Sequence, residues 1–435
     1  MAEHYWIETL GCPKNRVDSE KLAGVLLDDG YRPAVSPAEA DLVVVNTCAF
    51  IEAARQESID VILELAGARR EGGRLVVTGC LAERHGAELA RTMPEIDLVA
   101  GFGVPVTLGR RGWHSQRPRL DLLNLSRPRT ELPWAYVKVA EGCDRRCGFC
   151  AIPQFRGRQR SRSASAVLAE VEALGDGVHE VVLVAQEVSA WGLDRSAPVT
   201  RRHPGAERPI LGLLRELSER VERVRLLYLY PSSLDEALVE SIASTGVPYF
   251  DLSLQHVSRS LLSRMRRWGD EVRFLEQIAM IRAIAPDAAL RSSFILGYPG
   301  ETEADQDRLL DFLAAAELDW AGFFTFSEEE GTYAEQLPEK VAGELALERL
   351  RECSETQDAI TAAKRSALVQ ERISVLVDEP GRSRSHREAP EIDGIVNVPR
   401  DLPVGQICEV SVTGAAGPDL WAERIPAARE VGAIR

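Results

Sequence analysis

The sequence predicts an α/β chain in three consecutive parts: an N-terminal parallel α/β domain, a series of six βα units and a small C-terminal all-β domain. Three observations lead to this prediction. Strand-like and helix-like patterns alternate over about the first hundred residues, the alternation starts again at Trp134, and short alternating segments replace it after Gln370. At 435 residues the chain is also too long for one ordinary domain.

The N-terminal part, residues 1–110, is predicted to form a parallel sheet with helices on its faces. Helices are expected at Asp18–Asp29 and Glu52–Ala68. Strands are expected at His4–Thr9, Asp41–Asn46 and Arg74–Thr78. Residues 103–133 are richer in Pro, Arg and Gly and only weakly periodic, so we expect a linker there.

The six βα units fill residues 129–365, with helices expected at Ser165–Leu174, Leu211–Arg220 and Thr302–Ala315. The expected strands are Trp134–Val139, Glu180–Val184, Val224–Tyr230, Tyr249–Leu254, Leu290–Leu296 and Trp320–Phe326. Since nothing signals a reversal of strand order, the pattern favours a partial barrel over a doubly wound sheet. Periodicity alone does not separate the two folds.

The C-terminal part, residues 366–435, is predicted to be a small β domain. A long helical stretch, Val341–Gln370, leads into it. Short segments separated by Gly and Pro then follow, as is typical of strands: Ile373–Val377, Gly394–Val398, Cys408–Val412 and Leu420–Ala422.

Composition and charge argue against several classes of protein. Apolar residues make up 45% of the chain and charged residues 27%, as in a soluble globular protein. No apolar run approaches the roughly eighteen residues that span a bilayer, and the N-terminus lacks the features of a signal peptide, so we expect a cytoplasmic protein without a membrane partner. The formal net charge of −15 argues against a surface that binds nucleic acid all over, although a local basic groove is compatible with it.

Three of the eight cysteines form the motif C-x3-C-x2-C: Cys143, Cys147 and Cys150. A long chain without an export signal is not expected to carry a disulfide framework. Three thiolates on one loop suit an iron–sulfur cluster with one iron left open, because soft thiolate ligands select such metals. The alternative is a loop whose cysteines are buried or bind zinc, but zinc needs a fourth ligand and no second C-x2-C pair follows.

Three further cysteines, Cys12, Cys48 and Cys80, each follow a predicted strand of the N-terminal sheet. The carboxyl ends of parallel strands share one edge, where ligands bind in open α/β sheets. The three cysteines can therefore converge on one metal centre. Three unrelated buried cysteines explain the pattern equally well, because free cysteine is often buried.

Polar residues and glycines follow the predicted barrel strands, where the active sites of such barrels lie. The candidates are Gln186 and Glu187 after the second strand, Gln255 and His256 after the fourth, and Gly297 and Gly300 in the segment GYPGE after the fifth. Glycines leave room for a ligand to approach the backbone. A helix-capping or core histidine and a plain tight turn are the alternatives for His256 and for the glycines.

The cysteine motif, the aromatic Phe149 before its last cysteine and its place after the first strand of a βα series resemble the radical S-adenosylmethionine superfamily. The resemblance implies a partial (βα)6 barrel and a [4Fe–4S] cluster whose open iron binds S-adenosylmethionine as cosubstrate. It also implies reductive cleavage of the cosubstrate to a 5′-deoxyadenosyl radical. Residues after the second strand and in the glycine segment would contact the cosubstrate.

The layout of the whole chain resembles the methylthiotransferase family, in which a cysteine-bearing domain precedes the radical core and a TRAM domain follows it. The resemblance implies two [4Fe–4S] clusters, one held by Cys12, Cys48 and Cys80 and one by Cys143, Cys147 and Cys150. It implies that a methylated sulfur from the first of these clusters is transferred to a substrate carbon radical, with no catalytic residue beyond the cluster ligands. Cys353 and Cys408 match no motif of the family and are expected to be structural.

Two branches of that family modify different substrates: an aspartate β-carbon of small-subunit ribosomal protein S-twelve, or an isopentenyladenosine of tRNA. The segment at residues 11–20, GCPKNRVDSE, is similar to the ribosomal-protein branch, which has Pro-Lys after the cysteine where the tRNA branch typically has Gln-Met. The segment at residues 186–192, QEVSAWG, resembles Q-D-T-S-x-Y-G of the same branch with three substitutions, and Ser253 replaces the proline of I-P-L-Q-H. We therefore expect a ribosomal-protein aspartate methylthiotransferase, with tRNA modification as the alternative.

Charge favours the same branch. Residues 370–435 hold eight Arg against eleven Asp or Glu, and an acidic domain complements a basic ribosomal protein better than it complements tRNA phosphates. A solvated surface without a role is the alternative. Arginines around the C-x3-C-x2-C motif suit a cluster, a carboxylate or a phosphate alike, and so do not discriminate: Arg145, Arg146, Arg156, Arg158, Arg160 and Arg162.

The expected partners are ribosomal protein S-twelve, free or in the small subunit, and an electron donor such as flavodoxin or ferredoxin. The chain itself is expected to be a monomer. A protein of another class, a non-catalytic metal-stabilised RNA-binding protein, predicts zinc or no metal instead of about eight irons per chain. It also predicts that replacing Cys143 with alanine unfolds the chain.

Overall fold

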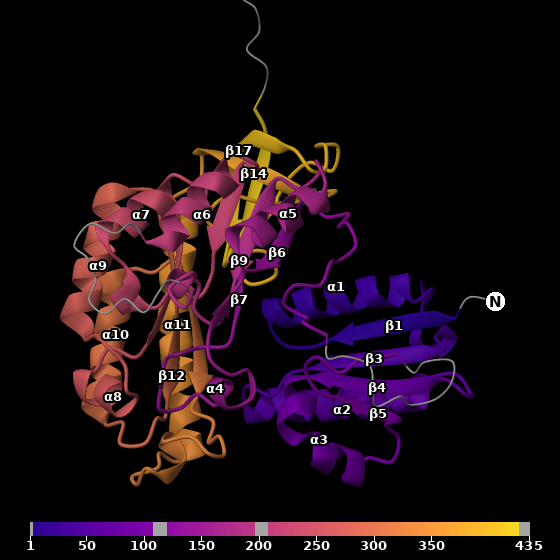
Figure 1. Cartoon of the computed structure of the whole chain (residues 1–435). Helices are drawn as coiled ribbons and strands as arrows, with labels where there is room; N and C mark the ends of the chain where they lie inside the picture. The colour runs from indigo at the N-terminus through magenta and orange to yellow at the C-terminus, as the bar shows by residue number, and fades with distance from the viewer. Residues whose placement is uncertain (1–2, 108–119, 196–207, 426–435) are drawn as a thin grey trace, which may run out of the picture.

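The chain folds into three units, described by a computed structural model for residues 3–107, 120–195 and 208–425. Figure 1 shows the N-terminal domain beside the central barrel and a C-terminal β unit above it. The predicted fold class is confirmed. Residues 108–119 of the predicted linker and residues 426–435 of the predicted C-terminal domain lie outside the described residues. None of the helices in the described ranges is long and apolar enough to cross a membrane.

The N-terminal domain is a five-stranded parallel sheet in the order β2-β1-β3-β4-β5. Its elements are β1 (His4–Thr9), α1 (Pro13–Asp28), β2 (Arg32–Pro33), β3 (Leu42–Thr47), α2 (Glu52–Ala68), β4 (Arg74–Gly79), α3 (Cys80–Thr92) and β5 (Leu98–Ala100). Both faces of β3 are buried because its side chains alternate. Val43 and Val45 pack with α2 and α3 residues, whereas Val44 packs with Leu22 and Leu26 of α1.

The central unit is an open barrel of six parallel strands that follow one another in sequence order. The strands are β6 (Trp134–Lys138), β9 (Glu180–Val184), β10 (Arg223–Leu226), β11 (Tyr249–Gln255), β12 (Ala289–Leu296) and β13 (Trp320–Thr325). A bridge between Leu229 and Leu252 joins the two halves. No pairing among the described strands joins β6 to β13, so the barrel is open on that side.

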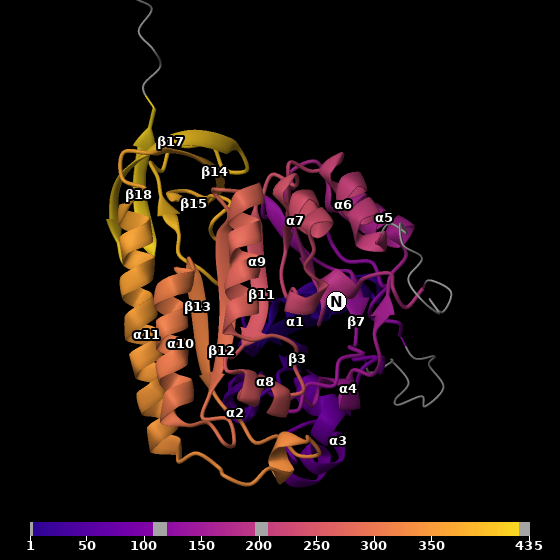
Figure 2. The same cartoon turned by 90° about the vertical axis from the view of Figure 1, so that its left-hand side faces the viewer.

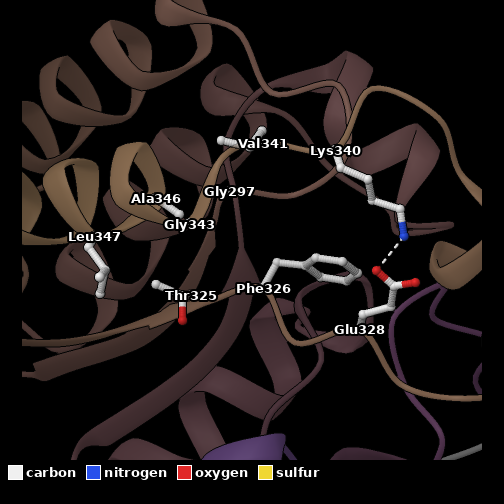
Figure 3. A pocket seen from close by; sticks show the side chains of 9 residues that line it. All are labelled: Gly297, Thr325, Phe326, Glu328, Lys340, Val341, Gly343, Ala346 and Leu347. Atoms are coloured by element: carbon white, nitrogen blue, oxygen red, sulfur yellow. Dashed lines mark ion pairs between the residues drawn. The ribbon is translucent and has the colours of Figure 1, made fainter.

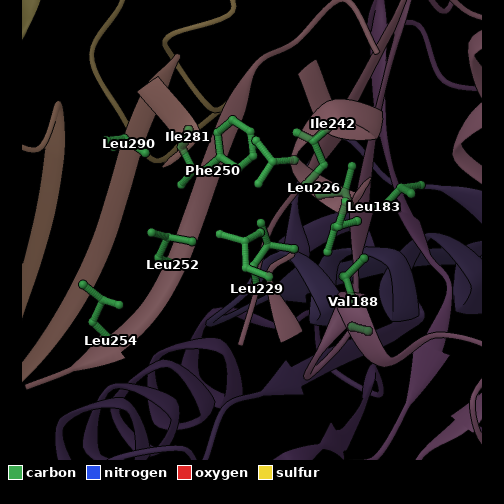
Figure 4. Packing of buried hydrophobic residues seen from close by; sticks show 14 of the residues in the cluster. Leu183, Val188, Leu226, Leu229, Ile242, Phe250, Leu252, Leu254, Ile281 and Leu290 are labelled. Atoms are coloured by element: carbon green, nitrogen blue, oxygen red, sulfur yellow. The ribbon is translucent and has the colours of Figure 1, made fainter. Parts of the chain in front are cut away.

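Helices cover the outside of this barrel, and the largest apolar cluster lies between them and the strands. The helices are α5 (Ala164–Leu174), α6 (Pro209–Ser218), α7 (Glu236–Ala243), α8 (Arg259–Arg264), α9 (Glu271–Ile284), α10 (Glu303–Ala316) and α11 (Gly343–Ser366). Figure 4 shows Leu226, Phe250 and Leu252 of the strands packed toward Ile242 and Ile281 of the helices. Figure 2 shows α11 running up the outside to the C-terminal unit.

The C-terminal unit is a closed barrel in the strand order β14-β15-β16-β18-β17. Its strands are β14 (Arg372–Glu379), β15 (Arg382–Arg384), β16 (Val396–Asn397), β17 (Ile407–Ala416) and β18 (Asp419–Arg424). The segment between β15 and β16 covers the N-terminal ends of the central strands. Tyr136 donates a hydrogen bond to the carbonyl of Pro390 at 2.8 Å, and Trp320 donates one to that of Arg387 at 2.6 Å. This cover favours a site at the opposite, carboxyl ends of the central strands.

Candidate functional site

Cys12, Cys48 and Cys80, the N-terminal cysteine set, lie at the carboxyl ends of three adjacent strands: β1, β3 and β4. Glycines make the close approach possible. A Cβ atom on Gly11, which has a positive φ of 89°, would lie 2.8 Å from the Cys48 sulfur, and one on Gly79 would lie 2.5 Å from the carbonyl oxygen of Thr47. The structure therefore brings these strand ends together.

Buried polar groups hold the strand ends in place. The Asn15 amide donates to the carbonyl of Leu10 at 2.9 Å and to that of Thr47 at 3.0 Å, which ties the loop after β1 to the end of β3. Arg156 donates to the Asn15 side-chain oxygen at 2.9 Å, and the same nitrogen lies 3.0 Å from the Cys80 sulfur. A guanidinium beside a cysteine is a ready counter-charge for an anionic thiolate centre.

The three thiols of this set differ in the direction of their pKa shifts. Burial raises the pKa of Cys48 to about 12 and also raises that of Cys80, whereas the charges of Lys14 and Arg156 outweigh burial and lower the pKa of Cys12. A bound metal would supply the positive charge that deprotonates such thiols. Within the described ranges, no three His, Cys, Asp or Glu side chains are grouped as for one metal ion. A [4Fe–4S] cluster instead attaches each thiolate to a different iron, which requires a wider spacing.

Cys143, Cys147 and Cys150, the loop cysteine set, lie between the short strand β7 (Ala140–Glu141) and helix α4 (Ile152–Phe155), at the carboxyl end of β6. Backbone hydrogen bonds fix this loop. The Gly148 N–H donates to Met265 at 2.8 Å, and the Gly148 carbonyl accepts from the Ala334 N–H at 2.8 Å. A guanidinium nitrogen of Arg267 lies 3.1 Å from the Cys147 sulfur. As in the N-terminal cysteine set, a cation accompanies the thiols.

The arginines around this loop mostly pair with carboxylates of the protein itself. The pairs are Arg145 with Glu187, Arg156 with Glu141, Arg158 with Asp144, Arg160 with Asp121 and Arg162 with Glu170. Arg145 binds both oxygens of Glu187, at 2.6 and 2.8 Å, and stacks on Tyr230 with its central carbon 3.8 Å from the ring centroid. Glu187 therefore orients a loop arginine.

The other sequence-predicted contacts have different surroundings. Gln186 donates to Glu141 at 2.7 Å, and Gln255 ends β11 with a positive φ of 73°. His256 is fully buried, which lowers its pKa to about 4, and its Nδ1 accepts from the Ser258 N–H at 3.0 Å. Complete burial favours the core-histidine alternative, and the role of His256 in cosubstrate binding stays a prediction.

The glycine segment adjoins a pocket of about 340 Å³ at the carboxyl ends of β12 and β13 (Figure 3). Gly297, Thr325 and Phe326 line one side, and an ion pair of 2.6 Å between Glu328 and Lys340 spans another. Gly297 and Gly300 both have positive φ, 74° and 85°. A Cβ on Gly297 would lie 2.6 Å from that of Ala346, whereas at Gly300 the positive φ, more than the movable Arg264 side chain, disfavours any other residue, so the fold alone accounts for both glycines.

A buried ionic network that the sequence did not reveal links the two cysteine sets. Its members are Asp18, Lys138, Glu141, Arg156 and Gln186. The Arg156 side chain is 1% exposed and lies 2.8 Å from Glu141, two residues before Cys143, while its other nitrogen contacts Cys80. Burial alone would raise the pKa of Glu141, but Arg156 and Lys138 hold it well below its usual value. The only sequence signal was the arginine crowding around the motif.

The N-terminal domain covers the open side of the central barrel. Helix α1 packs against β6. On the other side, Glu329, after β13, is buried and paired with Arg55 of α2 and Arg84 of α3. Both edges of the opening are therefore joined to the N-terminal domain.

Family models match all three units: uncharacterized protein family UPF0004 at residues 4–101, the radical SAM superfamily at 137–313 and the TRAM domain at 369–425. Together with the open six-stranded barrel and its cysteine loop, these matches define a radical S-adenosylmethionine enzyme. Relatives named "Ribosomal protein uS12 methylthiotransferase RimO" are 41% identical in Anaeromyxobacter sp. strain K, over 97% of this chain and 93% of that protein, and 41% identical in Moorella thermoacetica, over 93% and 95%. The chain belongs to the RimO methylthiotransferase family.

A third relative of the same name, from Chloroflexus aurantiacus, is 38% identical over 97% of this chain and 99% of that protein. Among solved structures, the radical S-adenosylmethionine methyltransferase TsrM from Kitasatospora setae is similar with a TM-score of 0.49 and 17% identity, covering 77% of each chain.

Proposed function

We propose that this enzyme replaces a β-carbon hydrogen of an aspartate in ribosomal protein S-twelve with a methylthio group, using S-adenosylmethionine and two [4Fe–4S] clusters. One observation carries the proposal: two cysteine sets from different domains are linked through the single buried side chain of Arg156. The full-length similarity to relatives named for this reaction agrees with it. Two linked metal centres suit a reaction that must both cleave a cosubstrate and deliver sulfur.

The cysteines would hold the clusters in two groups, the N-terminal cysteine set and the loop cysteine set. When bound, the clusters and the cosubstrate supply the radical and sulfur chemistry, which no side chain of the protein can supply. The protein itself binds, orients and encloses the clusters and the cosubstrate. Asn15 fixes the strand ends behind Cys12 and Cys48, Arg156 balances the charge beside Cys80, and the N-terminal domain contacts both edges of the open side of the barrel.

The cosubstrate contacts also belong to this proposal. They are Gln186, Glu187, Gln255, His256, Gly297 and Gly300. Support differs among them: Gly297 lines a pocket, and Glu187 orients Arg145 over Tyr230 beside the loop cysteine set. The predicted domain ranges, 1–110, 129–365 and 366–435, are proposed likewise.

The partner is proposed to be the basic ribosomal protein because residues 370–435 hold eight Arg against eleven Asp or Glu. Arg384 is buried against Glu180 and Asp378, and Arg365, just before the barrel, is buried against Glu388. Burial thus hides charges of both signs, and the excess of acidic over basic residues remains the argument for a basic partner. We further propose that the protein is a cytoplasmic monomer, reduced by a flavodoxin or a ferredoxin.

Substrate choice tests the proposal. The anaerobically reconstituted enzyme, with S-adenosylmethionine and a reductant, is offered a peptide carrying the aspartate loop of ribosomal protein S-twelve and an isopentenylated anticodon stem. We expect mass spectrometry to find a methylthio group on the peptide alone. A methylthio group on the RNA alone would overturn the proposed substrate and leave the enzyme class intact.

A further inference from the structure

Lys14 differs from the other lysines of the chain in its surroundings. The other four form ion pairs with carboxylates: Lys21 with Glu170, Lys138 with Asp18 and Glu141, Lys340 with Glu328, and Lys364 with Asp319. For Lys14, none of the carboxylates in the described ranges lies within ion-pair distance. Its ammonium group instead lies 3.5 Å from the centroid of the Tyr228 ring. A half-buried cation on an aromatic ring is held weakly and remains free to bind an anion.

The contact places Lys14 between the two cysteine sets. Lys14 is two residues after Cys12, and Tyr228 belongs to the segment that follows β10. Two residues further on, Tyr230 carries the guanidinium of Arg145 from the loop of Cys143. Two residues span at most about 7 Å of backbone. One short segment of the barrel therefore contacts both Lys14, which lies beside the N-terminal cysteine set, and Arg145, which lies beside the loop cysteine set.

Four neighbouring arginines already have partners. Arg145 binds Glu187, Arg156 binds Glu141, and Arg291 binds Asp251, whose other oxygen accepts from the Tyr228 N–H at 2.9 Å. Arg267 is engaged by the Cys147 sulfur and the carbonyl of Ser253. An incoming carboxylate would have to displace an ion-pair partner of Arg145, Arg156 or Arg291, or the sulfur and carbonyl contacts of Arg267, but no ion-pair partner of Lys14.

We propose that Lys14 binds the side-chain carboxylate of the substrate aspartate and so determines specificity for an acidic residue. This inference rests on the proposed function. The carboxylate carbon of aspartate is bonded directly to the β-carbon, so a cation that holds the carboxylate also places the reacting C–H bond. A charge-assisted hydrogen bond to one lysine rejects the isosteric asparagine, which cannot supply the negative charge.

The test compares two peptides of the ribosomal-protein loop that differ only in aspartate or asparagine at the modified position. Binding to the cluster-loaded enzyme is measured by fluorescence anisotropy, and methylthio transfer is measured on both. We expect the wild-type enzyme to bind the aspartate peptide roughly tenfold or more tightly than the asparagine peptide. Lys14→Met should bind the two equally, since methionine keeps the stem over Tyr228 but loses the charge, and Lys14→Arg should restore the preference.

Two controls change one positive charge elsewhere. Lys364→Gln removes the charge of a lysine on α11. Arg146→Met removes an exposed cation of the loop between Cys143 and Cys147. Both variants should keep the preference for the aspartate peptide. A Lys14→Met enzyme that still prefers the aspartate peptide overturns the inference, as does one that loses iron and weakens both peptides equally, because Lys14 would then serve the cluster. If the wild-type enzyme modifies neither peptide, the proposed function itself fails.

Discussion

Arg156 offers the sharpest test of how the two cysteine sets are joined. Its side chain is 1% exposed and touches Glu141, Asn15 and the Cys80 sulfur. Arg156→Met removes the charge and leaves Glu141 buried with Lys138 and Gln186 as its remaining partners. Removing one member of a buried ion pair costs about 3–5 kcal/mol, and the remaining lysine places this case toward the lower end of that range.

Two assays follow the effect of Arg156→Met. Urea unfolding should show a free energy of unfolding lower by about 3 kcal/mol, and iron analysis should show loss from the N-terminal cysteine set before the loop set, because the cation beside Cys80 is gone. Arg158→Met is the matched control, since Arg158 is on the same loop but its side chain is exposed and pairs with the exposed Asp144. It should leave both measurements unchanged.

A double variant separates two costs of Arg156→Met: the cost of leaving the Glu141 carboxylate without its arginine, and the cost of lost packing. Arg156→Met combined with Glu141→Gln removes the carboxylate that the single variant leaves uncompensated, so the double variant should lose at least about 1 kcal/mol less than the sum of the two single losses. Strict additivity would refute the reasoning, and so would an Arg156→Met enzyme as stable as wild type.

Three further predictions concern other parts of the chain. Cys80→Ala should halve the iron content from about eight to about four per chain, whereas Cys353→Ala, in the core, should keep it; iron and sulfide analysis decides. Glu180→Gln should lower the free energy of unfolding by about 3 kcal/mol or more. It should also remove the part of the wild type's loss of stability at acidic pH that is due to protonation of Glu180. The folded-state pKa of Glu180 is lowered to about 2 by buried arginines, so its contribution is present above its usual pKa and is lost as the pH falls toward 2. His256→Ala should cost about 1–3 kcal/mol by leaving the Ser258 N–H without its acceptor, and His256→Asn, which restores an acceptor, should recover most of that loss in urea unfolding.

Much of the fold could be predicted because the central strands are runs of apolar residues. Leu42–Thr47 and Arg74–Gly79 were recognised for that reason, to within a residue or two. The edge strands β2 and β5 were missed, because two or three residues show no periodicity. Strand β15, with the sequence RSR, was missed because a buried ion pair to Glu180, and not apolar residues, holds it against the core.

The expected third barrel strand, Val224–Tyr230, was too long. In the structure β10 ends at Leu226, and Tyr228 adopts a positive φ of 65°. This turn presents Tyr228 to Lys14 and Tyr230 to Arg145. A backbone conformation that tyrosine rarely adopts leaves no mark on the sequence pattern.

The site, like the fold, could be predicted from the sequence only in part. The placement of Cys12, Cys48 and Cys80 at neighbouring strand ends could be predicted, because parallel strands end at one shared edge. That property alone did not separate convergence on one metal centre from three unrelated buried cysteines, and only the family resemblance favoured convergence. The network of Asp18, Lys138 and Arg156 could not be found from sequence, because it forms only when two domains dock. No local pattern shows which of many charged residues will be buried together at such an interface.

The most direct test of the proposed reaction follows the hydrogen that leaves the substrate. A loop peptide of ribosomal protein S-twelve with deuterium on the β-carbon of its aspartate is incubated anaerobically with the reduced enzyme and S-adenosylmethionine. The account predicts a methylthio group on that aspartate and deuterium in the 5′-deoxyadenosine formed with it. A peptide that gains the methylthio group while the 5′-deoxyadenosine stays unlabelled, or a peptide that gains nothing, would contradict it.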